Sequence, residues 1–339
     1  MVIIFVYFCN SKVYLMNSLE ALQKPVADVL EEYKQQFEET LRSDNQLLQQ
    51  AVNHLLQKKG KLVRPTLVFL SARLFGKVNQ KVYDVALALE LLHTASLVHD
   101  DVVDESDRRR GQASVNALMT NQIAVLVGDF ILSRALHHAA QTGDAKVVDV
   151  VANLGETLAD GELLQLANLD ADKLDEASYY MVVRKKTSSL FAVAAQLGVL
   201  TSGGSEEQAE RMRRFGHLVG TCFQLKDDIF DYDSKADIGK PAGNDMKEGK
   251  LTLPVIHAIN KTKNEEMLAK ALKVRRGEAT KEDIEELIGF TIENGGIEYA
   301  YWAMNEFRMM ADGLLDESRD PAILESLHSL VNFVAERKY

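Results

Sequence analysis

A long stretch without proline is the feature that most limits what this chain can fold into. All five prolines lie outside residues 66–240, at Pro25, Pro65, Pro241, Pro254 and Pro321. Inside a helix, proline removes a backbone hydrogen bond and clashes with the preceding turn. The stretch is instead rich in Ala, Leu, Glu, Gln and Lys, which favour helices. It therefore predicts one large helical domain.

Signals that start helices recur along the chain. Ser43 is predicted to cap a helix that begins QLLQQ, and capping boxes are predicted at Ser205 with Gln208 and at Thr280 with Asp283. Turn signals flanked by the alternating apolar pattern of β-hairpins are not found. We therefore expect an all-α fold.

Two segments, residues 85–98 and 190–200, are apolar on nearly every side. Helices of this kind are packed all round, so we expect them at the centre of the molecule. Residues 234–254 break the helical pattern with three glycines, two prolines and four lysines. A polar loop of this length is typically functional or disordered.

The composition argues against some classes of function. The formal net charge is −11, which opposes a general nucleic-acid-binding role, because that role depends on a basic surface. Cysteine occurs only at Cys9 and Cys222, too few for a disulfide framework or a cysteine-based zinc site. We expect a reducing, cytoplasmic location.

The first residues do not fit the pattern of the rest. MVIIFVYFC is nine apolar residues long, far shorter than a membrane span, and it lacks the basic start of a signal peptide. We expect residues 1–15 to be a non-conforming tail, either a mis-chosen start or a loose segment, with a weak surface anchor as the alternative. Residues 16–339 are expected to form a single domain without a transmembrane segment.

Two acidic motifs, DDVVD and DDIFD, each follow an apolar helix. Together they supply six carboxylates: Asp100, Asp101, Asp104, Asp227, Asp228 and Asp231. Acids four residues apart on one helix face repel each other, and an isolated motif of this type is most often a solvated face. Its repetition favours a shared site instead. Clustered carboxylates suit Mg²⁺, which prefers a few hard oxygen ligands together with water and phosphate oxygens.

Basic residues that could bind phosphate accompany the acidic motifs. They are Lys61, Arg64, Arg109, Arg110, Lys186, Lys240 and Lys250. Taken alone, Lys61 and Arg64 would be an ordinary basic turn before a helix, because Pro65 is typical of a first helical turn. Together with the acids, the basic residues predict a site for a metal ion and a phosphorylated substrate.

The motifs, taken in order, resemble those of the trans-type polyprenyl diphosphate synthases, in particular enzymes that make long chains such as heptaprenyl, octaprenyl and solanesyl diphosphate. The resemblance runs from about Lys58 to Pro254 and is carried by GKLVRP, LLHTASLVHDDVVD, RRG, GELLQL, KT, FQLKDDIFD, GKPAGND and KEGKLTLP. It implies the isoprenoid synthase fold, a single large bundle of long helices around a deep central cavity. Both aspartate motifs would lie at the mouth of that cavity.

The resemblance also implies a reaction. An allylic diphosphate, farnesyl or geranylgeranyl diphosphate, would lose its diphosphate, and isopentenyl diphosphate would attack the resulting cation head to tail. Mg²⁺, roughly three ions per site, would stabilise the leaving group as a Lewis acid. Asp100, Asp104 and Asp227 would hold the metal, with Asp101, Asp228 and Asp231 beside them.

The remaining roles follow from the same resemblance. The catalytic residues nearest the cation would be Lys186, Thr187 and Gln224. The allylic diphosphate would contact Arg109, Lys186, Thr187, Gln224, Lys240 and Lys250. Isopentenyl diphosphate would contact Lys61, Arg64, His93 and Arg110. On the residues alone, a histidine such as His93 on an apolar helix is more often a core residue. Glu162 with Gln165 matches a motif of the resembling family, but the pair could equally be a buried structural network.

The length of the product depends on where its tunnel is blocked. Each added isoprene unit gains about 3–4 kcal/mol of burial, so elongation continues until a side chain stops it. In the resembling family the blocking positions lie just before the first aspartate, where this chain has Ala95 and Ser96, with Leu92 a turn deeper. The small pair predicts a long product, roughly seven to ten isoprene units, that partitions into membranes as a quinone side chain.

Several alternatives remain open at this point. The chain could be a short-chain prenyl diphosphate synthase, a non-catalytic subunit of a heteromeric synthase, or a di-iron carboxylate bundle using Glu90–His93 and Glu325–His328. A terpene cyclase would not need the second basic site. The resembling family usually forms homodimers, to which residues 115–137 could contribute. The preferred primer, the product length within the long-chain class and the oligomeric state are left open.

Overall fold

The computed structural model describes residues 19–57, 60–109, 111–170, 173–232, 243–316 and 319–337. The predicted tail of residues 1–15 and the predicted start of the domain at residue 16 lie outside these residues.

The described residues are almost entirely helical, which confirms the all-α class. The α-helices are α1 (Leu19–Gln23), α2 (Ala27–Thr40), α3 (Gln46–Leu56), α4 (Val63–Phe75), α5 (Gln80–Val103), α6 (Val115–Leu118), α7 (Asn121–Gln141), α8 (Ala145–Ala167), α9 (Glu176–Val183), α10 (Ser189–Ser202), α11 (Glu206–Phe230), α12 (Asn244–Lys247), α13 (Leu253–Thr262), α14 (Glu265–Arg275), α15 (Lys281–Glu293), α16 (Gly296–Asp312) and α17 (Pro321–Glu336). Short 3-10 turns lie at η1 (Lys24–Val26) and η2 (Asn168–Asp170), and a π turn lies at η3 (Arg184–Ser188).

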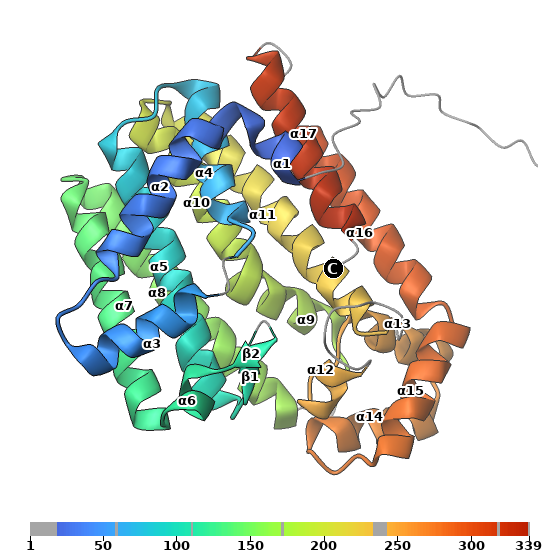
Figure 1. The fold of residues 1–339 in the computed structure, drawn as a ribbon. Coiled ribbons are helices and arrows are strands. Elements are labelled where there is room, and N and C mark those ends of the chain that lie inside the picture. Colours follow the sequence, from blue (N-terminus) through green and yellow to red (C-terminus); the bar gives the residue numbers. More distant parts are fainter. Residues whose placement is uncertain are drawn as a thin grey trace, which may run out of the picture.

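The centre of the bundle is formed by α10 and α11, with α4, α5 and α16 packed around them (Figure 1). Both segments predicted to be central contribute to this core. Residues 82–92 of α5 are buried without interruption, and most of α10 is buried as well. Helices without a polar face are stable here because neighbours cover every side.

Two glycines let α11 approach its neighbours closely. A Cβ placed on Gly216 would lie 2.3 Å from the backbone oxygen of Phe191 in α10, and one on Gly220 would lie 2.7 Å from Cα of Ser188 in η3. Such distances exclude a side chain without movement of the backbone. The glycines thus fix α11, which carries the second aspartate motif, against the helix that carries Lys186 and Thr187.

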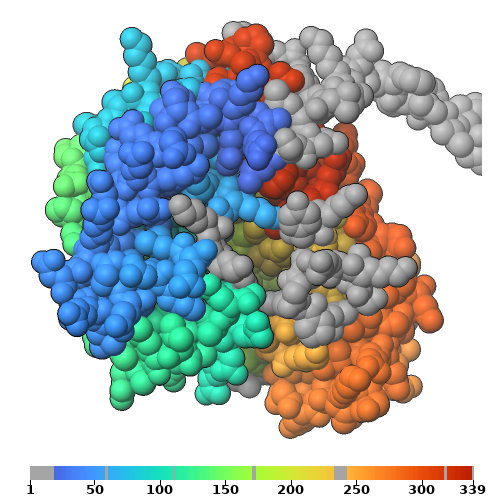
Figure 2. Space-filling view, in the orientation of Figure 1, coloured from blue at the N-terminus to red at the C-terminus, as the bar shows by residue number. Residues whose placement is uncertain are grey.

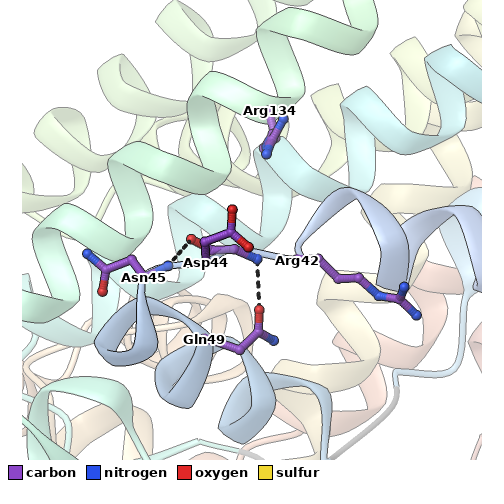
Figure 3. A pocket seen from close by; sticks show the side chains of 6 residues that line it. Arg42, Asp44, Asn45, Gln49 and Arg134 are labelled. Atoms are coloured by element: carbon purple, nitrogen blue, oxygen red, sulfur yellow. Dashed lines mark hydrogen bonds between the residues drawn. The ribbon is translucent and has the colours of Figure 1, made fainter.

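Two of the three predicted helix caps are confirmed and one is wrong. Ser205 and Thr280 each form a reciprocal capping box at the start of α11 and α15. Ser43 does not cap α3, because the Asn45 side chain accepts hydrogen bonds from the N–H groups of Leu47 and Leu48 instead. The Ser43 hydroxyl instead accepts a hydrogen bond from the N–H of Asn45 at 3.2 Å. Asp44, Asn45 and Gln49 of this loop and helix start line a pocket (Figure 3).

One small piece of sheet was not expected. Strands β1 (Arg108–Arg109) and β2 (Gln112–Ala113) pair antiparallel, with Arg109 opposite Gln112. The hairpin follows the end of α5 directly, so it determines where the arginines after the first aspartate motif point. Its strands are too short for the alternating pattern by which strands are recognised in a sequence.

Helix α7 has an unusual surface. Within the described ranges, it alone is long and apolar enough to cross a membrane by length and composition, with 39% of its most apolar window buried. The core helix of a soluble protein meets the same two criteria, so length and composition do not identify α7 as a membrane span. Its exposed apolar side chains include Leu126, and Leu163 is similarly exposed on the neighbouring α8.

Candidate active site

A cavity of about 1030 Å³ opens at the end of the bundle where both aspartate motifs lie. Its walls come from α5, α8, α9, η3 and α11 and from the segment around α12. In Figure 2 the surface is hollowed between two parts of the chain. On one side lie the blue α3 and the blue-green β-hairpin, and on the other lie the orange segments of α12–α14. The arrangement agrees with the expected deep cavity in a helical bundle.

Most of the predicted site residues line this one cavity. They are Arg64, His93, Asp100, Asp104, Arg109, Lys186, Thr187, Gln224, Asp227, Asp228 and Lys250. Lys61, Asp101 and Asp231 are not in its lining. Arg110 and Lys240 lie outside the described residues, and Leu92, Ala95 and Ser96 do not reach the cavity wall.

The first aspartate motif lies at the C-terminal end of α5. The helix ends at Val103, and the N–H of Asp104 donates to the carbonyl of Asp100 at 2.8 Å. Acids are unfavourable at this end of a helix, because the backbone carbonyls there already carry partial negative charge. Burial raises the pKa of Asp100 to about 6, and Lys186 opposes this effect while Glu162 and Asp104 add to it.

Two other acids of this motif are paired with basic residues. Asp104 meets Lys250 Nζ at 3.3 Å, and Asp101 accepts from Arg109 Nε at 2.8 Å. Burial lowers the pKa of Lys250, but the carboxylates of Glu248 and Asp104 outweigh it and raise the pKa overall. Arg109 and Lys250, both predicted to bind diphosphate, are therefore held beside the predicted metal ligands.

The second aspartate motif centres on a buried hydrogen-bond network. Asp228 accepts from the hydroxyl of Tyr179 and from Gln224 Nε2 at 2.8 Å, and the hydroxyl of Thr187 donates to Gln224 Oε1 at 2.8 Å. Burial raises the pKa of Asp228 to about 7, against the effect of Tyr179 and Gln224. Tyr179 was not singled out in the sequence, where it is one of two adjacent tyrosines in a helix without a motif.

Asp231 is not among the residues that line the cavity. Its carboxylate accepts hydrogen bonds from the N–H groups of Asn244 and Asp245, at 2.8 and 3.2 Å, at the start of α12. Asp245 lines the cavity, and burial together with Asp231 and Asp228 raises its pKa well above the usual value. The sequence showed Asp245 only as part of the GKPAGND motif.

Asp227 faces the last described residue of the chain. Arg337 Nη2 donates to Asp227 Oδ1 at 2.7 Å and to the carbonyl of Phe223 at 2.8 Å. The Arg337 side chain is 8% exposed and that of Asp227 is 44% exposed. Burial raises the pKa of Asp227, and Arg337 opposes it. Nothing in the sequence near residue 337 indicated this contact.

Lys186 and Thr187 lie in the π turn η3, where the helix widens by one residue. Lys186 forms an ion pair with Glu162, and its Nζ donates to Gln165 Oε1 at 3.2 Å. Glu162 and Gln165 therefore belong to a network that holds Lys186 at the cavity wall.

Two of the four basic residues of the predicted isopentenyl diphosphate site, Arg64 and His93, line the cavity. The guanidinium of Arg64 lies 5.0 Å from the ring centroid of Phe191. The Lys61 side chain is exposed overall, but partial loss of water around its amino group lowers its pKa. The positive charge of Arg337 lowers this pKa further, and the negative charge of Asp227 opposes the change.

The donor set suits a hard metal ion that is shared with a substrate. Among the described residues, no three His, Cys, Asp or Glu side chains are placed to hold one ion. The residues of the di-iron alternative, Glu90–His93 and Glu325–His328, form no such group within the described ranges. Asp100, Asp104 and Asp227 nevertheless line one cavity with carboxylate oxygens, and Mg²⁺ is commonly bound by one or two carboxylates, water and substrate phosphates.

Comparisons with known proteins agree with this geometry. The polyprenyl synthetase family profile matches residues 45–290. An octaprenyl diphosphate synthase of Haemophilus influenzae is 35% identical over 325 residues, which cover 96% of this chain and 98% of that protein.

Solved structures share the whole fold. A polyprenyl synthase from Caulobacter crescentus, complexed with calcium and isoprenyl diphosphate, has a TM-score of 0.88 at 30% identity, covering 95% of this chain and 99% of that one. A geranylgeranyl pyrophosphate synthase from Bacteroides thetaiotaomicron has a TM-score of 0.83 at 41% identity, covering 94% of this chain and 99% of that one. Family match, relatives and fold thus place the chain in the polyprenyl synthetase family, as a trans-prenyltransferase.

Proposed function

We propose that this enzyme condenses isopentenyl diphosphate head to tail onto farnesyl or geranylgeranyl diphosphate and makes a long all-trans polyprenyl diphosphate. The observation that carries the proposal is the single cavity in which carboxylates and basic side chains from distant parts of the chain meet. Such a cavity suits a substrate with a highly charged end and an apolar tail.

The chain's own residues would bind and orient the allylic diphosphate. Arg109, Lys186 and Lys250 would donate hydrogen bonds to the diphosphate as its C–O bond breaks, and Lys240 is assigned the same role by the resemblance. Thr187 and Gln224, which are bonded to each other at 2.8 Å, would place their oxygen dipoles near the allylic cation. Preorganised dipoles of this kind stabilise developing charge without further reorganisation.

The second substrate would lie beside Lys61, Arg64, His93 and Arg110. Its double bond would form the new C–C bond to the allylic carbon, and a proton would leave to the released diphosphate. Mg²⁺, held by Asp100, Asp104 and Asp227, would supply Lewis-acid stabilisation of the departing diphosphate. Asp101, Asp228 and Asp231 would support these ligands. The resemblance implies roughly three ions per site.

The long product rests on Ala95 and Ser96. Ala95 is 2% exposed in α5, so a larger side chain there would have to displace its neighbours. The names of similar proteins do not agree on length, since one makes octaprenyl diphosphate and another is a geranylgeranyl pyrophosphate synthase. Use of the product as a quinone side chain, a cytoplasmic location and one domain over residues 16–339 stay predictions.

A homodimer would explain the exposed apolar side chains of α7 and α8. Leu126 and Leu163 are 67% and 65% exposed, and contiguous apolar surface on a folded chain typically marks an interaction site. We propose that a second copy of the chain covers this face.

Radiolabelled isopentenyl diphosphate tests the proposal directly. The purified chain is incubated with it, farnesyl diphosphate and Mg²⁺, and the dephosphorylated products are separated by chromatography. Labelled prenols of heptaprenyl length or longer would support both the reaction and the product length. Geranylgeraniol alone would keep the reaction and contradict the length, while no product with any allylic primer would favour a non-catalytic subunit.

A further inference from the structure

We propose that Arg337 is a resident counter-ion of Asp227: its guanidinium neutralises this carboxylate while no metal ion is bound and must leave before Asp227 can bind metal. The inference rests on the proposed function, in which Asp227 is a metal ligand. It assigns a positioning role to the end of the chain, which acts through Asp227.

The contacts of Arg337 show how it is held. Nη2 donates to both Asp227 Oδ1 and the carbonyl of Phe223, at 2.7 and 2.8 Å. The guanidinium lies 3.8 Å from the ring centroid of Phe223 and 5.7 Å from that of Phe230. Nε is buried and has no hydrogen-bond partner within the described residues. Asp227 is the acid to which this buried cation is paired.

A buried cation with one acidic partner cannot lose that partner at no cost. Removing the partner of a buried charge leaves that charge uncompensated, which destabilises a protein. When a divalent cation takes the carboxylate, like charges are brought together, and Arg337 must turn toward water or toward another anion. It can do so without breaking a helix, because it follows the last residue of α17.

Other cations also act on Asp227. Arg64 and Lys61 both lower its pKa through their charge, although the ion pair with Asp227 is made by Arg337. A variant that lacks the Arg337 guanidinium therefore still has the positive charges of Arg64 and Lys61 near this carboxylate. Because these charges also oppose metal binding, the metal affinity of the variant should rise only moderately.

Three other acids at this end of the bundle are also paired with basic side chains, which a metal ion or a substrate would have to replace as partners. Lys250 pairs with Asp104, Arg109 with Asp101, and Lys186 with Glu162. In those three pairs, the cation is one that the proposed function assigns to diphosphate, so a substrate can accept the released cation. Arg337 differs because it has no such assignment. Metal and diphosphate should consequently bind far better together than either binds alone.

Binding of Mn²⁺, followed by the electron paramagnetic resonance signal of the free ion, tests the proposal without measuring turnover. Mn²⁺ has the oxygen preference of Mg²⁺. Wild-type chain and Arg337→Gln are titrated with Mn²⁺ alone and with Mn²⁺ plus inorganic diphosphate. We expect Arg337→Gln to bind Mn²⁺ alone about three- to thirtyfold more tightly, which lies within the range of couplings between contacting residues, and to gain less from diphosphate.

Two control variants separate charge from a general effect. Arg337→Lys keeps the positive charge and should bind Mn²⁺ alone as weakly as the wild-type chain. Arg214→Gln removes one positive charge from an exposed pair with Glu210, about 20 Å along α11 from Asp227, and should change nothing. If Arg337→Gln does not fold, Arg337→Met keeps an apolar contact on Phe223 and serves the same purpose.

Equal affinity of wild-type chain and Arg337→Gln for Mn²⁺ alone would overturn the inference. So would tighter binding by Arg337→Lys, because the charge would then not be what excludes the metal. Failure of the wild-type chain to bind Mn²⁺ even with diphosphate would point elsewhere, since the proposed metal site itself would then be absent.

Discussion

At the scale of single residues, Asp228 should make stability depend on pH. Its pKa is about 7 in the folded chain against an ordinary value of 3.8. Between these values the folded state binds a proton that the unfolded state does not, so the free energy of unfolding falls as pH rises through this window. The expected slope is about 1.4 kcal/mol per pH unit for one proton.

The variant Asp228→Asn should reduce that slope. Asparagine stays neutral and still offers an oxygen to Tyr179, so the metal-free chain should lose about one proton's worth of pH dependence. Urea unfolding at several pH values from 5 to 8 measures it. Asp149→Asn, on an exposed side chain of α8, is the matched control, and an equal slope in all three proteins would contradict the assignment.

Residue-level predictions from the sequence succeeded where the cause is local. Ser205 and Thr280 cap their helices because the partner lies three residues away. Ser43 failed because Asn45, only two residues later, competes for the same N–H groups. Arg337 could not have been predicted, since it lies 110 residues from Asp227 in the sequence. Such pairs depend on how whole helices pack.

At the scale of helices, the close approach of α11 to α10 should be sensitive to one methyl group. Gly216→Ala should lower the free energy of unfolding by about 1–3 kcal/mol, because the added Cβ would meet the Phe191 carbonyl. Gly289→Ala in α15 is the control, with no atom within 4 Å of its added Cβ. Alanine favours helices, so that variant should be more stable by about 0.5–1 kcal/mol.

Chemical denaturation of the two variants decides the point. A stable Gly216→Ala chain would mean that α10 and α11 can move apart, and the fixed position of the second aspartate motif relative to Lys186 would then be in doubt. The sequence predicted both helices and their apolar character. It did not predict the β-hairpin or the π turn, because neither is long enough to leave a periodic pattern.

At the scale of the whole molecule, the length of the tunnel should depend on Ala95. Ala95 is 2% exposed and is not part of the cavity wall. Under the proposed function the growing chain passes this position, so the ring of Ala95→Tyr should block it and shorten the product. Chromatography of labelled prenols measures the change. Ala322→Tyr, on the exposed start of α17, should leave the product distribution as it is. If Ala95→Tyr gives the same distribution of prenol lengths as the wild-type chain, this explanation of chain length is wrong.

The proposed homodimer makes a separate prediction for the assembly. Leu126→Glu should give a particle with the mass of one chain in native mass spectrometry, because a charge is placed in the covered face. Met309→Glu on α16 is the control, since Met309 is 59% exposed on a different helix, and it should keep the mass of two chains. A wild-type protein with the mass of one chain would remove the explanation offered for the apolar surface of α7.

The π turn at η3 has a consequence for how the chain tolerates changes in length. Successive residues of an α-helix are rotated by about 100° around its axis, and a π turn accommodates one additional residue. The extra residue is absorbed within the wide turn, so α9 and α10 keep nearly the relative rotation that a regular helix would give them. A residue inserted just before Phe191 in α10 would instead rotate the side chains beyond it by about 100°, and Phe191, which is fully buried, would turn out of the core. The chain should therefore pack α10 correctly after a one-residue deletion within Arg184–Ser188, but not after a one-residue insertion inside α10.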